Sequence, residues 1–376
     1  MLYSAVSIAP PRTWVLTSKK LGDNVQVLSI ANALGWPYEI KRLEFRGLNH
    51  FHFRFFGPSP RKVRIEQSSP LTPPWPDLVL TIGRRATPVA LWIRRQSRGR
   101  TKLVQVGQAR VGLDRFDLVI GNPQYHLPQS SNLLHLTLPL FAMDTAAVAA
   151  AAATWRSRFA HLPQPWIALF VGGSTAPFTL DVQAAQDLMQ ITKQIREHEG
   201  GSVLVTTSRR TASEVATALE AAMPEQGFFH RWSPDDPNNP YRGILGLADR
   251  FIVTGESISM LVEVVRQRKP LAIYPLPTRA TTIRLLCRRA LQDVFLPPRR
   301  TTRGVWSLRE TIGDILVQLG LLEYRRDFSL FHQQLIEQKR AVWLGEPFPV
   351  APPAPPDELP LVVKRINALF PQVSAT

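Results

Sequence analysis

The segment TGESISMLVE, residues 254–263, combines hydroxyl side chains with two carboxylates where a predicted strand passes into a predicted helix. Ser257 and Ser259 fall at the start of this helix, where backbone N–H groups without an intrahelical acceptor can bind a phosphate. Glu256 and Glu263 fall on one stripe opposite the apolar face, and a carboxylate such as Glu263 can accept two hydrogen bonds from a ribose diol. Glutamates that are simply solvated are the alternative, which composition by itself favours.

Two adjacent glycines follow the first predicted strand of the second half, in the turn VGGST at residues 171–175. Gly172 and Gly173 allow backbone N–H groups to approach an anion, and Ser174 adds a hydroxyl donor. A tight turn from strand to helix needs glycine in any case. The turn is neither the spaced GxGxxG motif nor a GxxxxGK[ST] loop, so it predicts an anion contact and no particular ligand.

Two arginines follow the next predicted strand, in TTSRRT at residues 206–211. Ligands of parallel sheets bind outside the carboxyl ends of the strands, so Arg209 or Arg210 can reach a phosphate there. Ser208 is a candidate cap for the helix that follows. A capped helix with two solvated arginines is the alternative interpretation.

The first half offers a smaller set of candidates, which begins in the loop KKLGDNVQ at residues 19–26. Asp23 is a candidate general base, and Gly22 permits close backbone approach. Asp23 also suits the N-cap of the next helix, which is the alternative. Arg84 and Arg85, after the second predicted strand, are candidate anion contacts.

Other common kinds of site find no support in the sequence. The eight histidines show no metal-ligand spacing, and the single cysteine, Cys287, excludes an intrachain disulfide and a cysteine-rich metal site. No GxSxG motif occurs, so a hydrolase triad is not expected. We expect no metal and no cofactor.

Short apolar runs alternate with segments of helical spacing, which is typical of parallel sheets with crossover helices. The predicted strands are 14–18, 77–83, 102–107 and 117–122 in the first half, and 167–173, 202–208, 250–255 and 271–276 in the second. Two such arrays predict two doubly wound, Rossmann-like α/β domains that face a cleft. The expected domains are 1–160 and 161–348, followed by a proline-rich tail at 349–376 whose helix packs back toward the N-terminal domain.

The chain of 376 residues carries a formal net charge of +16 at pH 7, which favours an anionic partner. A membrane surface or a phosphorylated substrate is preferred to nucleic acid, because the arginines are spread along the chain and no nucleic-acid-binding motif occurs. No apolar run reaches the ~18–20 residues that span a bilayer, and the N-terminus does not resemble a signal peptide. We therefore expect a cytoplasmic location.

The segment 45–64 interleaves aromatic and basic residues. It predicts a patch that docks on an anionic membrane, where each Lys or Arg adds about 1 kcal/mol. An ordinary loop packed on its own domain is the alternative. The predicted docking patch consists of Phe51, Phe53, Phe55 and Phe56 with Arg54, Arg61 and Lys62.

Four segments together resemble a known family: PWPDLVLTIGRRATPVA at 74–90, LFVGGST at 169–175, VLVTTSRRT at 203–211 and NPYRGILGLADRFIVTGESISMLVEV at 239–264. They are similar to the ELM-type family, which is named for plant proteins of mitochondrial fission and whose bacterial members are described as glycosyltransferases. The GDNVQ sequence at 22–26 and the segment 327–348 resemble the same family. The stretch 279–326 is longer than in its simplest members.

The second half is also similar to the membrane-associated N-acetylglucosaminyltransferase of peptidoglycan synthesis, an enzyme of the GT-B fold. That resemblance implies that the GGS turn, Gly172–Ser174, faces the diphosphate of a nucleotide-sugar. It further implies that Ser257 and Ser259 assist and that Glu263 holds the ribose. GT-B enzymes need no bound metal, so the resemblance implies none.

Pattern and resemblance together predict a GT-B glycosyltransferase whose donor is a nucleotide-diphosphate sugar, with UDP as the expected nucleotide. The donor is expected on the second domain and the acceptor on the first, with Asp23 as the base. The expected acceptor is a lipid-linked or lipopolysaccharide-type glycan at the inner face of a bacterial inner membrane, where the protein would bind peripherally. A non-catalytic membrane adaptor and a nucleotide-sugar epimerase of the same fold remain the alternatives.

Overall fold

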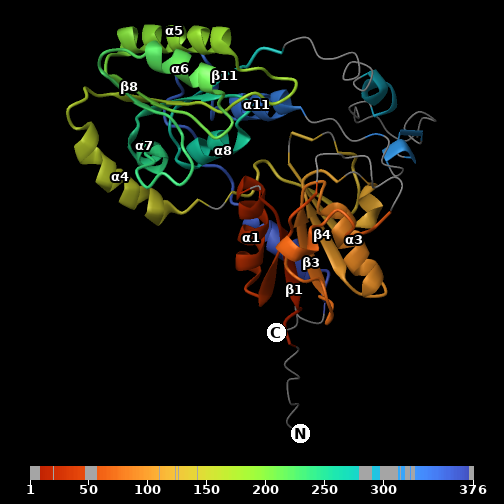
Figure 1. The fold of residues 1–376 in the computed structure, drawn as a ribbon. Helices are drawn as coiled ribbons and strands as arrows, with labels where there is room; N and C mark the ends of the chain where they lie inside the picture. The colour runs from red at the N-terminus through yellow and green to blue at the C-terminus, as the bar shows by residue number, and fades with distance from the viewer. Residues whose placement is uncertain are drawn as a thin grey trace. The chain divides into compact units, whose positions relative to one another are not determined.

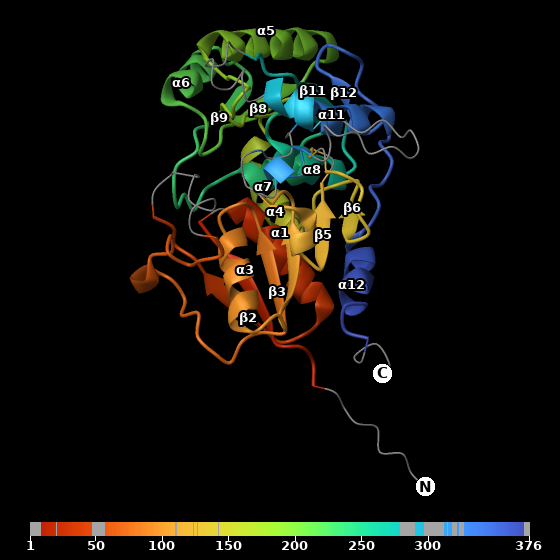
Figure 2. The same cartoon turned by 90° about the vertical axis from the view of Figure 1, so that its right-hand side faces the viewer.

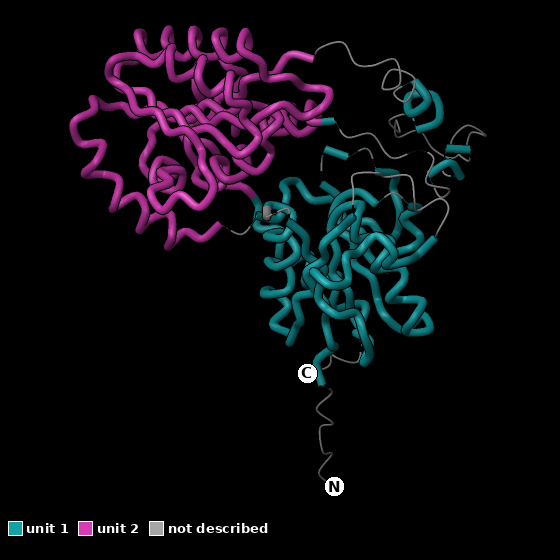
Figure 3. Tube along the Cα trace, viewed as in Figure 1, with its two compact units in different colours: residues 1–142, 284–327, 356–376 teal, residues 143–283, 328–355 magenta. Residues whose placement is uncertain are grey.

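The chain folds into two compact units, each of which is described here by itself (Figure 3). Unit 1 comprises residues 1–142, 284–327 and 356–376, and unit 2 comprises residues 143–283 and 328–355. The structure is a computed structural model. It describes residues 9–19, 21–46, 57–109, 111–122, 124–125, 127–141, 143–278, 290–296, 312–313, 315–317, 322 and 327–371.

Unit 1 is built on a parallel sheet of six strands in the order β2-β1-β3-β4-β5-β6 (Figure 1). The three central strands are buried along their length except at Lys102 and Ile82, as expected of a sheet covered on both faces. The strands are β1 (Thr13–Thr17), β2 (Tyr38–Arg42), β3 (Leu78–Ile82), β4 (Lys102–Val106), β5 (Leu118–Gly121) and β6 (Leu133–His135).

Helices cover both faces of this sheet. α3 (Thr87–Gln96) packs on the face that contains Trp14 and Leu16 of β1. α1 (Leu21–Leu34) and α12 (Leu359–Asn367) pack on the opposite face, and α12 contacts both α1 and β5 (Figure 2). Two short 3-10 helices, Ile65–Gln67 and Leu113–Arg115, also belong to unit 1.

Unit 2 repeats this architecture with the strand order β12-β11-β10-β7-β8-β9, again all parallel. Helices α5 and α6 cover one face of the sheet, and α7 and α8 lie on the other (Figure 1). The strands are β7 (Trp166–Phe170), β8 (Ser202–Thr206), β9 (Gly227–His230), β10 (Arg250–Thr254), β11 (Leu271–Tyr274) and β12 (Val342–Trp343). The helices are α4 (Thr145–Phe159), α5 (Val182–Glu199), α6 (Ser213–Ala221), α7 (Tyr241–Leu247), α8 (Ile258–Arg266) and α11 (Phe328–Glu337).

In each sheet the order in which successive strands are added reverses at one strand. In unit 1, β2 and β3 lie on opposite sides of β1, and in unit 2, β8 and β10 lie on opposite sides of β7. The loops that leave β1 and β3, or β7 and β10, therefore diverge from a common edge. Ligands of doubly wound sheets bind at such switch points. These two edges are where the predicted site residues must be sought.

The domain boundaries differ from the expected positions at 160 and 348. The first boundary lies at residues 142/143, so α4 belongs to unit 2, where it packs against α7. A Cβ atom on Gly243 would lie 2.5 Å from the Trp155 ring, which shows how closely these helices approach. Residues 349–355 also belong to unit 2, whereas 356–376, including α12, belong to unit 1. The return of the tail helix α12 to unit 1 was expected from the sequence, whereas the assignment of α4 to unit 2 and of residues 284–327 to unit 1 was not.

Candidate functional site

The turn after β7 lies against the turn after β10 at the switch point of unit 2. The Gly172 N–H donates to Oγ1 of Thr254 at 2.8 Å, and the Gly173 N–H donates to Oε1 of Glu256 at 2.7 Å. A Cβ on Gly172 would lie 1.8 Å from that Oε1, and one on Gly173 would lie 2.1 Å from the carbonyl oxygen of Arg210. Glycine is therefore required at both positions by close packing. Both amides already have acceptors within the protein, and the expected contact of this turn with a diphosphate stays a prediction.

Two predicted hydroxyl contacts also serve the local loops. Ser174 Oγ accepts from the Leu180 N–H at 2.9 Å and donates to the Leu180 carbonyl at 3.2 Å, which closes the loop between them. Ser208 Oγ accepts from the Arg210 N–H at 3.2 Å. It does not cap α6, whose N-cap is Ala212 and has no side-chain cap, so that prediction is wrong. These bonds hold both hydroxyls within their own loops.

The two arginines of the TTSRRT turn have different surroundings. Arg210 Nη1 donates to Thr175 Oγ1 at 2.6 Å, and its Nη2 lies 3.4 Å from Ser257 Oγ and 3.5 Å from Glu256 Oε1. Its side chain is still 40% exposed. Arg209 is exposed and makes no side-chain hydrogen bond or ion pair with the described residues. Arg210 is therefore the cation that the fold holds at the switch point.

Glu256 is a site residue that the sequence placed wrongly. It was expected on an exposed helical stripe, but α8 begins only at Ile258, and the Glu256 side chain is completely buried. Burial raises the pKa of Glu256 to about 7, against the opposing effects of the Gly173 N–H and the Arg210 charge. Its Oε2 has no hydrogen-bond partner among the described residues. A buried carboxylate thus lies among the donors expected for phosphate.

The N-terminus of α8 presents the remaining groups that the sequence suggested as phosphate contacts. Ser257 is buried, and its hydroxyl faces Arg210. The Leu261 N–H makes the first bond of this helix, to the Ser257 carbonyl at 3.1 Å. The amides from Ile258 to Met260 precede it and form the positive end of the helix dipole. Ser259, in this first turn, is partly exposed.

Glu263 lies one turn further along α8 than Ser259, on the same face of the helix. The Tyr241 hydroxyl donates a hydrogen bond to its Oε2, and the Tyr241 ring packs on Phe170 at a centroid distance of 4.6 Å. Burial raises the pKa of Glu263, opposed by the Tyr241 hydrogen bond and the Arg242 charge. Burial and the neighbouring Glu263 also raise the pKa of Tyr241. A simply solvated Glu263 is excluded.

A residue from the C-terminal part of unit 2 supports the same turn. His332 of α11 is buried, and its Nε2 lies 2.6 Å from the carbonyl oxygen of Gly255. A Cβ on Gly255 would lie 2.8 Å from His332 Cε1, so glycine is needed here too. His332 stands in the phenylalanine-rich segment 327–348, which resembled the ELM-type family but received no role from sequence reasoning.

In unit 1, the two predicted loops meet at the corresponding switch point. A Cβ on Gly83, just after β3, would lie 3.6 Å from Asp23 Oδ2. Gly83 has φ +77°, a conformation that favours glycine. Arg84 and Arg85 follow and are exposed. The structure therefore brings the candidate base and the loop of the two candidate arginines to one edge.

Two details of the first loop correct the sequence interpretation. α1 begins at Leu21, so Asp23 lies inside its first turn and is not the N-cap. Asn24 instead ties the loop to β1, because its side-chain amide exchanges two hydrogen bonds with the backbone of Ser18, at 3.0 and 2.6 Å. Gly22 is exposed, and a Cβ there would meet only Phe141, at 3.9 Å.

Most of the predicted docking patch, residues 51 and 53–56, lies outside the described residues. Arg61 is exposed and Lys62 is partly exposed. Val63 is buried and forms an antiparallel bridge with Phe45. Of the stretch 279–326, Val317 and Leu322 are buried in the same apolar core as Trp14, so part of that stretch contributes to unit 1.

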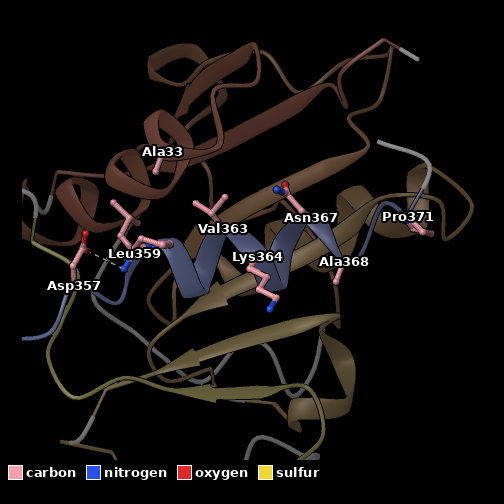
Figure 4. A pocket seen from close by; sticks show the side chains of 9 residues that line it. Ala33, Asp357, Leu359, Val363, Lys364, Asn367, Ala368 and Pro371 are labelled. Carbon is pink, nitrogen blue, oxygen red and sulfur yellow. Dashed lines mark hydrogen bonds between the residues drawn. The ribbon is translucent and has the colours of Figure 1, made fainter. Parts of the chain in front are cut away.

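A hollow of about 880 Å³ lies on unit 1 beside α12 (Figure 4). Leu359, Val363 and Ala368 line it from α12 and the end of that segment, and Ala33 lines it from the last turn of α1. Ala33 is ten residues from Asp23, or about 15 Å along a helix. None of the predicted site residues lines this hollow.

Comparison with known proteins identifies the family. The sequence model of the family described as Mitochondrial fission ELM1 matches residues 22–294. The chain belongs to this family. It is 26% identical over 220 residues to the mitochondrial fission protein ELM1 of Arabidopsis thaliana, covering 53% of this chain and 51% of that protein. The chain thus spans about half the length of this curated relative.

Similar solved structures show the fold. A crystal structure of a candidate UDP-N-acetylglucosamine 2-epimerase from Listeria monocytogenes is 12% identical, with a TM-score of 0.50 over 97% of this chain and 98% of that one. MurG of Acinetobacter baumannii is 14% identical, with a TM-score of 0.42 over 95% of this chain and 100% of that one. With its two six-stranded parallel sheets and their flanking helices, this member of the ELM1 family has the GT-B fold. None of the helices described is both long enough and apolar enough to cross a membrane.

Proposed function

We propose that unit 2 of this ELM1-family protein binds a nucleotide-diphosphate sugar, with UDP as the nucleotide, and that the protein transfers the sugar. One observation carries the proposal: Arg210, the N-terminus of α8 and Glu263 converge at the switch point between β7 and β10. A guanidinium and free helix amides are suited to phosphate, and a carboxylate one turn away is suited to a ribose diol. This combination matches the two polar parts of a nucleotide.

Each group has a distinct role in the proposed complex. The diphosphate lies against Arg210 and the amides that precede Leu261, with the Ser259 hydroxyl as a further donor. The ribose hydroxyls donate to Glu263, whose Oε2 is held by Tyr241, so that Oε1 remains as an acceptor. Arg209, which is exposed beside Arg210, extends the positive region.

In the proposed reaction the bond between the anomeric carbon and the diphosphate oxygen breaks as an acceptor hydroxyl attacks that carbon. Arg210 and the α8 dipole stabilise the charge that develops on the leaving diphosphate. Asp23 of unit 1 takes the proton of the acceptor hydroxyl. Gly22, Arg84 and Arg85 belong to the same edge of unit 1, where the arginines would contact an anionic acceptor.

We assign the acceptor to the lipid-linked or lipopolysaccharide-type glycans of a bacterial inner membrane. The net charge of +16 and the basic, aromatic segment 45–64 support peripheral binding to its anionic inner face. Liposome flotation tests this part separately. Charge reversal at Arg61 and Lys62 is expected to weaken binding to anionic vesicles, and unchanged binding would remove the docking patch from the proposal.

A non-catalytic adaptor is the second candidate. The description of the family as mitochondrial fission proteins favours it, because that description names no reaction. An epimerase of the same fold would differ from a transferase in needing no acceptor, so analysis of products formed from the donor alone separates those two reactions.

The deciding experiment is a thermal-shift screen with UDP, GDP, CMP and their sugars. A ligand at about 100 times its dissociation constant adds about 2.7 kcal/mol to the free energy of unfolding, which raises the melting temperature visibly. We expect a shift with UDP that is much smaller in Glu263→Gln. Glu225→Gln is the matched control, because Glu225 is exposed and lies just before the amino end of β9, whereas the proposed site lies at the carboxyl ends of the strands. No shift with any nucleotide would favour the adaptor.

A further inference from the structure

Glu256 already occupies the donors that a phosphate group would use. Its Oε1 accepts from the Gly173 N–H at 2.7 Å and faces Arg210 Nη2 at 3.5 Å. Thr254 Oγ1 adds a longer contact at 3.4 Å. A main-chain amide of a glycine turn and a guanidinium are typical ligands of a phosphate oxygen. The carboxylate therefore takes the place of an anion inside the protein itself.

The position of this carboxylate is built into the fold. The space for Oε1 exists only because residue 172 is glycine, since a Cβ there would come within 1.8 Å of it. The side chain is 0% exposed, so water does not screen its charge. Oε2 is equally buried and has no partner among the described residues. A buried oxygen of this kind is costly as part of a carboxylate and is the natural place for a proton.

We propose that Glu256 is a built-in anion at the phosphate site, and that a phosphate group binds there together with a proton, which Glu256 takes up at Oε2. The inference rests on the proposed nucleotide site of unit 2 and adds a condition for its occupation. A phosphate that engages Arg210 draws the guanidinium away from Glu256 and adds negative charge beside a buried carboxylate. Protonation from solvent removes that repulsion, while Oε1 keeps its hydrogen bond from Gly173.

Few other charged or titratable groups of the described chain face Glu256. Arg210, from the turn after β8, is the cation that acts on its charge. His332, from α11, contacts the residue before Glu256, because its Nε2 is hydrogen-bonded to the Gly255 carbonyl. Burial raises the pKa of Glu256 to about 7, so the carboxyl changes its charge within the range in which the protein can be measured. Its charge state can therefore control the affinity for phosphate.

Isothermal titration calorimetry of the full chain tests the inference, with inorganic pyrophosphate and UDP as separate probes. Titrations at about pH 6 and about pH 8, in buffers of different ionisation enthalpy, give both the affinity and the number of protons taken up. If only the protonated form binds, the wild-type affinity falls about tenfold over this range, because the competent fraction falls by that factor. Glu256→Gln removes this dependence, whereas Glu256→Asp retains it. The ionisation of the ligand itself is the same with each protein, so it cannot cause a difference in pH dependence between them.

The outcomes separate this inference from the proposed function. Equal pH dependence and equal proton uptake in the wild type and Glu256→Gln would overturn the inference and leave the nucleotide site intact. If pyrophosphate binds with a pH dependence that Glu256→Gln removes, but UDP does not bind, the inference is supported and UDP is overturned as the proposed nucleotide. Binding of neither probe would overturn both. If Glu256→Gln does not fold, proton uptake by the wild type that does not exceed the uptake of the ligand itself would overturn the inference.

Discussion

The hydroxyl of Tyr241 donates a hydrogen bond to Oε2 of Glu263, joining the first residue of α7 to the middle of α8. The bond holds one oxygen of the carboxylate and leaves the other for a ligand. Tyr241 is itself fixed by packing on Phe170 of β7. Tyr241 thus sets the orientation of the Glu263 carboxylate, which is proposed to accept hydrogen bonds from the ribose, without touching the ribose itself.

We expect Tyr241→Phe to lower the affinity for UDP about fivefold to thirtyfold, because the loss of one hydrogen bond to a charged group is worth about 1 to 2 kcal/mol. In the background of Glu263→Gln the same change should have a much smaller effect, since the two residues act as a pair. Tyr38→Phe, which removes an exposed hydrogen bond to Asn32 in unit 1, is the matched control. Calorimetric titration with UDP measures all three, and equal effects in both backgrounds would contradict the pairing.

Arg210 and Arg209 should differ in their contribution to binding. A charge-assisted hydrogen bond to phosphate contributes about 1.5 to 3 kcal/mol, so Arg210→Gln should weaken UDP binding by about tenfold or more. The Arg209 side chain makes no hydrogen bond or ion pair with the described residues, and Arg209→Gln should have an effect of less than about threefold. The dissociation constants of both variants check this ranking. A larger loss in Arg209→Gln would move the phosphate away from the Thr175 side of the site.

The stability of the protein should depend on pH through Glu256. Its pKa is raised to about 7, whereas in the unfolded chain a glutamate titrates near about 4.3. Between these values the folded state binds more protons than the unfolded state, so the free energy of unfolding falls as pH rises through this window. The loss is on the order of 4 kcal/mol and is complete above the folded pKa.

Glu256→Gln should therefore gain stability relative to the wild type as pH rises, whatever constant cost the substitution has. Urea unfolding at about pH 5 and about pH 8 measures the difference between the two proteins. The same comparison with Glu225→Gln, an exposed glutamate, should show no such change. A difference that stays constant with pH would mean that the carboxyl of Glu256 does not titrate in this range.

Gly172→Ala should destabilise the protein by about 2 to 4 kcal/mol, because the added Cβ overlaps a buried carboxylate. The cost should fall in the background of Glu256→Ala, which removes the overlapping oxygen. Gly22→Ala is the control, since Gly22 lies in α1 and a Cβ there would make only an ordinary contact with Phe141, so alanine should be neutral or stabilising by up to about 1 kcal/mol. Thermal unfolding distinguishes these cases. An equal cost of Gly172→Ala in both backgrounds would point to backbone strain instead.

The central strands of both sheets follow from the sequence, whereas the edge strands do not. The eight predicted strands correspond to β1, β3, β4 and β5 and to β7, β8, β10 and β11. The four strands that were missed are β2, β6, β9 and β12, and each lies at an edge of its sheet. Central strands of parallel sheets are continuous apolar runs, but edge strands are partly exposed and carry mixed residues. The strand YEIKR of β2 has a single buried residue, Lys41, and offers no such run.

The turns that form the candidate site could be predicted from the sequence, but the hydrogen bonds between their residues could not. The turns after β7, β8 and β10 were identified because parallel strands place their carboxyl ends together. Which donor meets which acceptor depends on side-chain packing, and this is why Glu256 was misplaced and the amides of Gly172 and Gly173 were assigned to a ligand. Tyr241 and His332 were missed because they lie outside these turns, and no local pattern marks them.

The chain completes unit 2 only after it has crossed into unit 1, because residues 328–355 return to supply α11 and β12. During synthesis on a ribosome, the turn at Gly255 therefore leaves the exit tunnel long before His332, the residue that secures it. The proposed nucleotide site cannot reach its final form before His332 has been synthesised. A nascent chain halted before residue 328 should expose the β11 edge of its sheet, and an unpaired strand edge of this kind favours aggregation.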